Sequence, residues 1–508
     1  MLLNDYSIAR PICFLATLFV LLSPGSQAAV ADQIWAGAAK IDITNRNVPL
    51  VNDPLYARAL VIKNDRTTIA IVTVDAVAIE EIGSITSAYL PAVRKQIEAD
   101  CGIEPRNIII NASHCHGIVC ADVTERTIQA IKAAWGKMVP VEVGVGAGHE
   151  DRIMENRRLK LKDGTEIDVR HAYSMPPDEE VAEVGPVDPQ IGILRLNKKS
   201  GETLAVVYNF ACHPIQGVPS GGNTADMTGF SSRVIEDNLS DGTIALFLQG
   251  CGGDINPAMY KAVDVPRDAE PLGNLLGLST LKALRTIETS DTGELKYLNE
   301  TIALPRADLT ERIEQLETEQ RKLLGSLRGT SLNLKTFVPL VVKYNLSEEF
   351  PTYYSHSYLH EKKLGRDTLA RLDAENRRNM EQYIQNIYTM EELTRLQTNL
   401  NLLKKHQAQN VAAGKRTIDV EVVGLKVGDF VLITFPGELT VPIGLNIKQR
   451  SPHKHTFVAG YTNGYIYYCP TAEQLKNVGR AQEDSDCILA PEWEAIFQTK
   501  VDEILKRL

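Results

Sequence analysis

The chain has 508 residues, of which 23% are charged and 44% hydrophobic, an ordinary balance for a globular protein with a large core. Its formal net charge of −10 argues against a nucleic-acid-binding protein, which would normally present a basic face. No long run of like charges occurs, so neither an acidic nor a basic tail is predicted.

The first 31 residues have the features of an export signal. An arginine ends the opening MLLNDYSIAR, the short apolar run PICFLATLFVLLSPG follows, and small residues offer cleavage sites after Ala28 or Ala31. The apolar run is too short, and too interrupted by proline, to span a membrane comfortably. An uncleaved N-terminal anchor is the alternative. We therefore predict a signal peptide over residues 1–31 and a secreted or periplasmic protein over residues 32–508.

Seven cysteines follow the predicted signal peptide, so at least one thiol is unpaired. The chain has no C-x-x-C pair, which argues against a zinc cage built from cysteines. Cys469 and Cys487 share one irregular segment and could form a disulfide, although the pairing cannot be deduced from sequence.

Strands and helices alternate through the first half of the chain. Buried strands are predicted over residues 67–79, 107–114 and 243–250. Amphipathic helices are predicted over residues 85–102, 121–138 and 229–239. Two more strands, QIGILRL and TLAVVYNFACHP, flank the turn NKKSGE and predict a hairpin. This alternation predicts an α/β fold, a layered mixed sheet flanked by helices, with functional residues at strand ends.

Residues 309–413 are rich in Glu, Lys, Arg, Gln and Leu at helical spacing. They predict a helical insertion packed on the core, and a coiled-coil partner surface is the alternative, since short heptad runs are present. Strands return in RTIDVEVVGLKVGDFVLITF, where KVGD marks a turn, and again in HTFVAGYTNGYIYYCP over residues 455–470. A final amphipathic helix is predicted over residues 491–508.

Several predicted apolar strands are followed by side chains that could bind a metal or take part in catalysis. The run NIII leads to His114 and His116, LAVVYNFAC to His213, TIALFLQGCGG to Asn256, and GDFVLITFPG to Glu438. One histidine at a strand end is usually a surface or hydrogen-bonded residue. Several such ends on one sheet favour a shared site, because open α/β sheets bind ligands at their carboxyl edge.

The spacing of His114, His213 and Glu438 matches no local zinc motif such as H-E-x-x-H, so the pattern alone is a weak metal signal. Two neutral imidazoles and one carboxylate are nevertheless a common ligand set for catalytic zinc, with room left for water. Nucleotide binding is disfavoured, because the glycine-rich stretches lack the context of a phosphate loop. The chain has no G-x-S-x-G elbow, which disfavours an ordinary serine esterase.

The chain resembles the neutral/alkaline (non-lysosomal) ceramidase family in seven short motifs that occur in the family's order. They are GAAKIDIT, NASHCHG, ENRR, NFACHP, GGDINP, FPGELT and TNGYIYY. The resemblance covers most of residues 35–305 and 415–505 and omits the helical insertion. Nothing in the chain corresponds to the C-terminal immunoglobulin-like domain of full-length ceramidases.

The resemblance implies a Zn²⁺ site made by His114, His213, Glu438 and Tyr465. A tyrosine beside a dication can bind as phenol or phenolate and so adjust the acidity of bound water. Three neighbouring tyrosines are alternatives to Tyr465 as the fourth ligand, and Tyr465 itself could instead be a packed aromatic residue. They are Tyr461, Tyr467 and Tyr468.

The resemblance also implies three catalytic positions beside the metal. His116 would handle a proton, and Arg157 would stabilise negative charge on the substrate, with Arg158 as the alternative because adjacent residues of a strand face opposite ways. Asn256 stands where the ceramidases have a serine that has been proposed as a nucleophile. Asparagine cannot form an acyl-enzyme, so the resemblance then implies attack by zinc-activated water, or an inactive homologue.

We therefore expect an exported, zinc-dependent amidohydrolase that cleaves an N-acyl amide bond, as in ceramide to sphingoid base plus fatty acid. The alternatives are a zinc esterase or deacetylase on another substrate, and a non-catalytic binding homologue that lacks the serine at position 256. The expected partner is a lipid or another N-acyl amide, and no nucleic acid. Peripheral contact with a membrane and the oligomeric state stay open.

Overall fold

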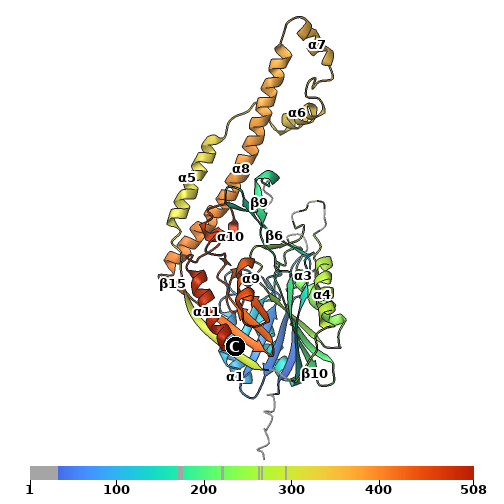
Figure 1. Cartoon of the computed structure of the whole chain (residues 1–508), viewed down its shortest axis with the longest axis vertical. Coiled ribbons are helices and arrows are strands. Elements are labelled where there is room, and N and C mark those ends of the chain that lie inside the picture. Colours follow the sequence, from blue (N-terminus) through green and yellow to red (C-terminus); the bar gives the residue numbers. More distant parts are fainter. Residues whose placement is uncertain are drawn as a thin grey trace, which may run out of the picture. The chain divides into compact units, whose positions relative to one another are not determined.

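Two mixed β-sheets form the centre of the fold in this computed structural model (Figure 1). The larger sheet has eight strands, in the order β12 (Ile244–Gln249), β11 (Thr203–Phe210), β10 (Gln190–Lys198), β5 (Val139–His149), β1 (Trp35–Asp42), β2 (Tyr56–Lys63), β3 (Thr68–Val74) and β4 (Ile108–Ala112). The smaller sheet has four strands, in the order β14 (Leu295–Pro305), β15 (Thr417–Val427), β16 (Phe430–Thr434) and β18 (His455–Ala459).

The structure describes residues 33–508 except 170–174, 219–221, 261, 263, 265–266 and 292–293. The predicted signal peptide lies outside the described residues. The short strands are β6 (Met154–Asn156), β7 (Arg158–Leu161), β8 (Glu166–Asp168), β9 (Val181–Val184), β13 (Ile255–Pro257), β17 (Glu438–Leu439) and β19 (Tyr468–Cys469). Single 3-10 turns span Pro105–Asn107, Asp178–Glu180 and Gln474–Lys476.

The two sheets pack face to face, and helices cover their outer faces. Leu60 and Leu194 of the larger sheet share one buried apolar cluster with Leu425 and Phe457 of the smaller sheet. The outer face of the larger sheet is covered by α1 (Tyr89–Cys101), α2 (Val123–Trp135), α3 (Asp226–Asp237) and α4 (Glu270–Leu284). The smaller sheet is covered by α9 (Val441–Arg450) and α11 (Trp493–Arg507). The predicted layered α/β fold, a mixed sheet flanked by helices, is confirmed.

The predicted hairpin is present, because β10 and β11 pair antiparallel. The strand predicted over residues 455–470 is wrong beyond Ala459. Tyr461, Asn463 and Tyr467 have φ values of 53°, 58° and 63°, so the backbone turns repeatedly after β18. An extended strand cannot include such left-handed residues, and after isolated bridges at Thr462 and Tyr467 a paired strand resumes only at β19.

Four helices lie within residues 310–412. They are α5 (Thr310–Ser326), α6 (Leu334–Leu346), α7 (Ser355–Lys363) and α8 (Thr368–Ala412). The C-terminal half of α8 packs beside α5, where Leu396, Leu400 and Leu403 form a small core with Leu309 and Leu316. Figure 1 shows α6 and α7 at the other end of α8.

The short α10 (Gln482–Ser485) lies between this helical segment and the site described below. Among the described residues, no helix combines the length and the apolar character needed to cross a membrane.

Candidate metal site

The side chains predicted at strand ends do meet at one edge of the two sheets. His114 follows β4 and His213 follows β11 in the larger sheet, whereas Glu438 follows β16 of the smaller sheet. The outermost strands of the larger sheet approach each other here, because the backbone N–H of Gln249 donates to Oδ1 of Asn111 (3.0 Å). This edge therefore brings three distant chain segments together.

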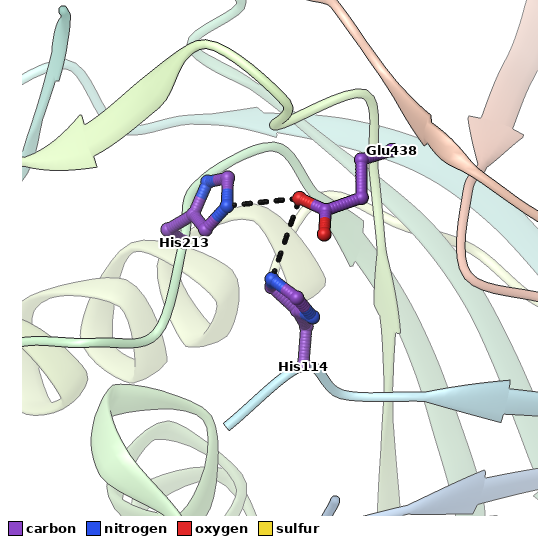
Figure 2. A group of neighbouring side chains, drawn as sticks. All are labelled: His114, His213 and Glu438. Carbon is purple, nitrogen blue, oxygen red and sulfur yellow. Dashed lines mark hydrogen bonds and ion pairs between the residues drawn. The ribbon is translucent and has the colours of Figure 1, made fainter. Parts of the chain in front are cut away.

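His114, His213 and Glu438 form a compact buried cluster (Figure 2). Nε2 of His213 lies 3.1 Å from Oε2 of Glu438, and Nε2 of His114 lies 3.5 Å from the same oxygen. The potential ligand atoms all lie within 4.8 Å of one another, a spacing that could hold a metal ion.

The backbone selects one tautomer of each histidine. Nδ1 of His114 lies 2.6 Å from the carbonyl of Val77, and Nδ1 of His213 lies 3.0 Å from the carbonyl of Ile255. A carbonyl only accepts hydrogen bonds, so each Nδ1 carries a hydrogen, and the neutral form of each ring presents the Nε2 lone pair. Burial lowers the pKa of His114 to about 4, which keeps this ring neutral at neutral pH.

Two lone pairs and a carboxylate oxygen facing one another form an electron-rich cluster that suits a cation. A buried cluster of this kind costs free energy unless a cation neutralises it. Two imidazoles and a carboxylate fit the ligand preference of a catalytic dication. His114 also has a φ of 68°, uncommon for a residue other than glycine, and such strain is concentrated at functional sites.

Tyrosine hydroxyls complete the polar surroundings of Glu438. Tyr465 donates a hydrogen bond to Oε1 (2.5 Å) and Tyr461 to Oε2 (3.1 Å) of this carboxylate. The hydroxyl of Tyr468 lies 3.3 Å from Nε2 of His213. Tyr467 instead donates to a carboxylate oxygen of Glu81 (3.2 Å). Three of the four candidate tyrosines therefore lie at the cluster.

A cavity of ≈150 Å³ opens on the cluster. It is lined by His114, His213, Glu438, His116, Arg157, Tyr465, Tyr467, Tyr468, Val77, Ile82, Ile215, Asp486, Leu402 and Lys405. His116 is exposed, and the centre of its ring lies 5.6 Å from that of His114. Leu402 and Lys405 belong to α8, so the helical segment forms part of the cavity wall.

Arg157 lies on this wall, but its guanidinium is engaged by the protein itself. Nε donates to Glu483 (2.6 Å), and Nη1 donates to Oδ1 of Asn256 (3.0 Å). Nη2 donates to the carbonyl of Gly253 (2.5 Å) and to the hydroxyl of Tyr468 (3.2 Å). Arg157 is fully buried, so these bonds fix the side chain against the site.

Arg157 lies between β6 and β7 and lines the cavity, whereas Arg158, the alternative expected from sequence, lies on β7 and is not among the residues that line it. Both arginines reach acidic residues of α10, and Arg158 binds Asp484 (2.9 Å). Sequence reasoning missed Glu483, whose surrounding QEDSD carries no recognisable signal for a buried ion pair.

Asn256 is buried in β13, where its Oδ1 accepts the hydrogen bond of Arg157. Its Nδ2 has no hydrogen-bond partner within the described part of the chain. The suggested disulfide is not formed, because Cys469 and Cys487 are free thiols whose Sγ atoms contact different carbonyls, of Tyr467 and Leu489.

Comparison with solved structures identifies the architecture. The neutral ceramidase from Pseudomonas aeruginosa matches with a TM-score of 0.58 and 15% sequence identity, over 94% of this chain and 75% of that chain. The fold is that of neutral ceramidase. A ceramidase complexed with C2 matches with a TM-score of 0.59 and 14% identity, over 94% of this chain and 76% of that one. No protein-family model and no curated protein sequence matches the chain.

The likeness to neutral ceramidase that the seven motifs predicted is thus confirmed in three dimensions. The matched 94% extends beyond residues 35–305 and 415–505, where the motifs lie. At 15% identity the match establishes the fold, so the chemistry has to be argued from the site itself.

Proposed function

We propose that the chain is an exported, zinc-dependent amide hydrolase that acts on a lipid or another N-acyl amide, as ceramidases act on ceramide. One observation carries the proposal: the Nε2 atoms of His114 and His213 converge on Oε2 of Glu438 at the wall of a cavity. The neutral ceramidase fold supports the same conclusion.

His114, His213 and Glu438 would hold the zinc ion, and Tyr465 would complete the ligand set. When bound, zinc supplies Lewis acidity and lowers the pKa of a coordinated water to about 7. The carbonyls of Val77 and Ile255 hold the two rings in the orientation that zinc binding requires. Tyr461 keeps one hydrogen bond on Glu438 and so restrains the carboxylate.

His116 would move the proton to the leaving amine. It is exposed on the cavity wall beside His114, and an imidazole is the side chain best suited to exchange protons near neutral pH. His116 would therefore act on the substrate rather than bind the metal.

Arg157 would be a positioning residue rather than the substrate-facing cation expected from sequence. Its contacts with Glu483, Asn256 and Gly253 hold the guanidinium in place, and its Nη2 holds the hydroxyl of Tyr468 at the cavity. A hydroxyl fixed in this way can donate to the negative charge that develops on a carbonyl oxygen.

The test is metal analysis together with hydrolysis of a short-chain labelled ceramide. Wild-type protein should carry close to one zinc per chain and cleave the amide, and His213→Ala should lose both. Zinc without hydrolysis of any amide or ester in a broad panel would reject the enzyme, and hydrolysis of esters alone would favour the esterase or deacetylase.

A non-catalytic homologue is the second candidate, and Asn256 favours it, because asparagine replaces the serine of the ceramidases. A protein of this kind would bind the same labelled lipid without cleaving it. Equilibrium binding measured alongside hydrolysis separates the two candidates.

A further inference from the structure

The end of the helical segment farthest from the sheets exposes apolar side chains. In α6, Leu334, Val338, Val342 and Leu346 recur every four residues, and all four are exposed, Leu346 to 82%. Residues at this spacing lie on one face of a helix. We call these four side chains, together with Tyr353 and Tyr354, the apolar tip.

The apolar tip is the outward face of a helix whose other face is occupied. Phe337 of α6 stacks on Tyr383 of α8, with ring centres 4.5 Å apart. The hydroxyl of Tyr344 donates to Asp373 of α8 (2.8 Å). α6 is therefore anchored through Phe337 and Tyr344, and the exposure of its apolar face does not result from a detached helix.

Two tyrosines extend the apolar tip beyond α6. Tyr353 is 91% exposed and Tyr354 is 60% exposed, directly before α7. An exposed tyrosine places an apolar ring and a polar hydroxyl at the same surface, which suits the boundary between lipid chains and headgroups.

Lysines lie on the two helices of the apolar tip. Lys335 and Lys343 lie on α6, which has no acidic residue, and Lys362 and Lys363 end α7. Residues 327–367 carry six Lys and Arg against four Asp and Glu, whereas the whole chain has a net charge of −10. This segment is thus slightly basic in an acidic chain, although Glu348 and Glu349 lie between Leu346 and Tyr353.

We propose that the apolar tip docks on the surface of an anionic lipid bilayer. An apolar helix face edged by lysine and joined by tyrosines has the composition of a helix that lies in the interface of a membrane. A second copy of the chain is a poorer occupant, because a symmetric contact would bring the lysines of two identical α6 helices into one interface. The docking is independent of the proposed hydrolase activity.

Sedimentation of the full chain with vesicles tests the docking, using phosphatidylcholine with or without phosphatidylglycerol and no ceramide. Wild-type protein should bind the anionic vesicles, and added salt should weaken the binding. The double variant Val338→Asp, Leu346→Asp should bind at least about tenfold more weakly. The control Leu278→Asp changes a leucine of α4 that is about as exposed as Val338, and it should bind like wild type.

Equal thermal unfolding of the variants and wild type establishes that the fold is intact, since all three side chains are exposed. The proposal is overturned if wild-type protein stays in solution at low salt, or if the double variant sediments like wild type. It is also overturned if wild-type protein does not bind the vesicles and instead forms a dimer that the double variant does not form. Because the vesicles contain no hydrolysable amide, none of these outcomes depends on catalysis.

Discussion

His213 and Glu438 are 225 positions apart in the chain, yet Nε2 of His213 lies 3.1 Å from Oε2 of Glu438. One residue follows a strand of the larger sheet and the other follows a strand of the smaller sheet. The distance therefore depends on the packing of the two sheets, and it is the relationship on which the proposed chemistry depends.

Replacing either histidine of the cluster is expected to abolish metal binding. His114→Ala or His213→Ala removes one of three ligands, so zinc content should fall to background. The rate of hydrolysis should fall at least about 100-fold, because replacing a residue that only hydrogen-bonds to a metal ligand already lowers metal affinity or activity by about 10–100-fold. Elemental analysis and a short-chain amide assay measure the two effects.

The matched control for the ligand variants is His149→Ala, which changes an exposed histidine paired with Asp151 away from the cluster. It should retain zinc and activity. Full zinc occupancy in His213→Ala would contradict the proposed ligand set.

His116→Asn is expected to separate catalysis from metal binding. The exposed ring lies beside His114 and is not part of the buried ligand cluster, so zinc content should stay that of wild type. The turnover number should fall by roughly 10²–10⁴-fold, the usual contribution of a general acid or base. Loss of zinc, or unchanged turnover, would show that His116 does not manage the proton.

Glu483→Gln tests the buried pair that holds Arg157. Oε1 of Glu483 accepts from Nε of Arg157 at 2.6 Å, and both side chains are buried. Removing one partner leaves a buried charge unpaired, and the free energy of unfolding should fall by about 3–5 kcal/mol. Urea denaturation measures the loss.

The control for this pair is Asp122→Asn, which breaks the exposed ion pair with Arg126 on the surface. Exposed pairs are screened by water, so its unfolding curve should overlay that of wild type. If the two variants unfold alike, Glu483 does not stabilise Arg157 as the distances indicate.

Asn256→Ser introduces the serine that the family resemblance implies at this position, and it is expected not to raise the rate of hydrolysis. A serine cannot reach as far as the Oδ1 that accepts from Nη1 of Arg157 (3.0 Å), so a buried donor loses its partner. The free energy of unfolding should fall by about 1–3 kcal/mol. A strong gain of amidase activity in the same assay would favour serine attack over attack by water.

Stability is expected to depend on pH through Glu150. Burial opposes its ionisation, but hydrogen bonds from Arg152 and Ser279 outweigh this effect and lower the pKa of Glu150 to about 2. A folded-state pKa below the ordinary 4.5 stabilises the fold above that value, and the stabilisation is lost as the pH falls through about 2.

The difference in unfolding free energy between wild type and Glu150→Gln should therefore be full at pH 6 and should shrink as the pH falls from about 4.5 towards 2. Urea titrations at pH 6 and pH 3.5 measure it. A difference that grows on acidification would have the wrong sign and would exclude this assignment.

The order of strands and helices could be predicted from sequence because it depends on local apolar periodicity. Residues 108–110 and 244–248 are continuous apolar runs, and they lie in β4 and β12, the buried outermost strands of the larger sheet. The irregular path of residues 460–467 could not be predicted, because Tyr461, Asn463 and Tyr467 adopt left-handed backbone angles that only their surroundings stabilise.

The candidate site divides in the same way. The sequence by itself determined which side chains follow the strands, including His114, His213 and Glu438. The residue that follows a strand is fixed by chain order, whatever the position of that strand in the sheet. Only the tertiary structure decided that these side chains meet, that Glu483 holds Arg157, and that α8 forms a wall of the cavity. Those contacts join residues hundreds of positions apart, and their distances depend on sheet packing, which no local pattern encodes.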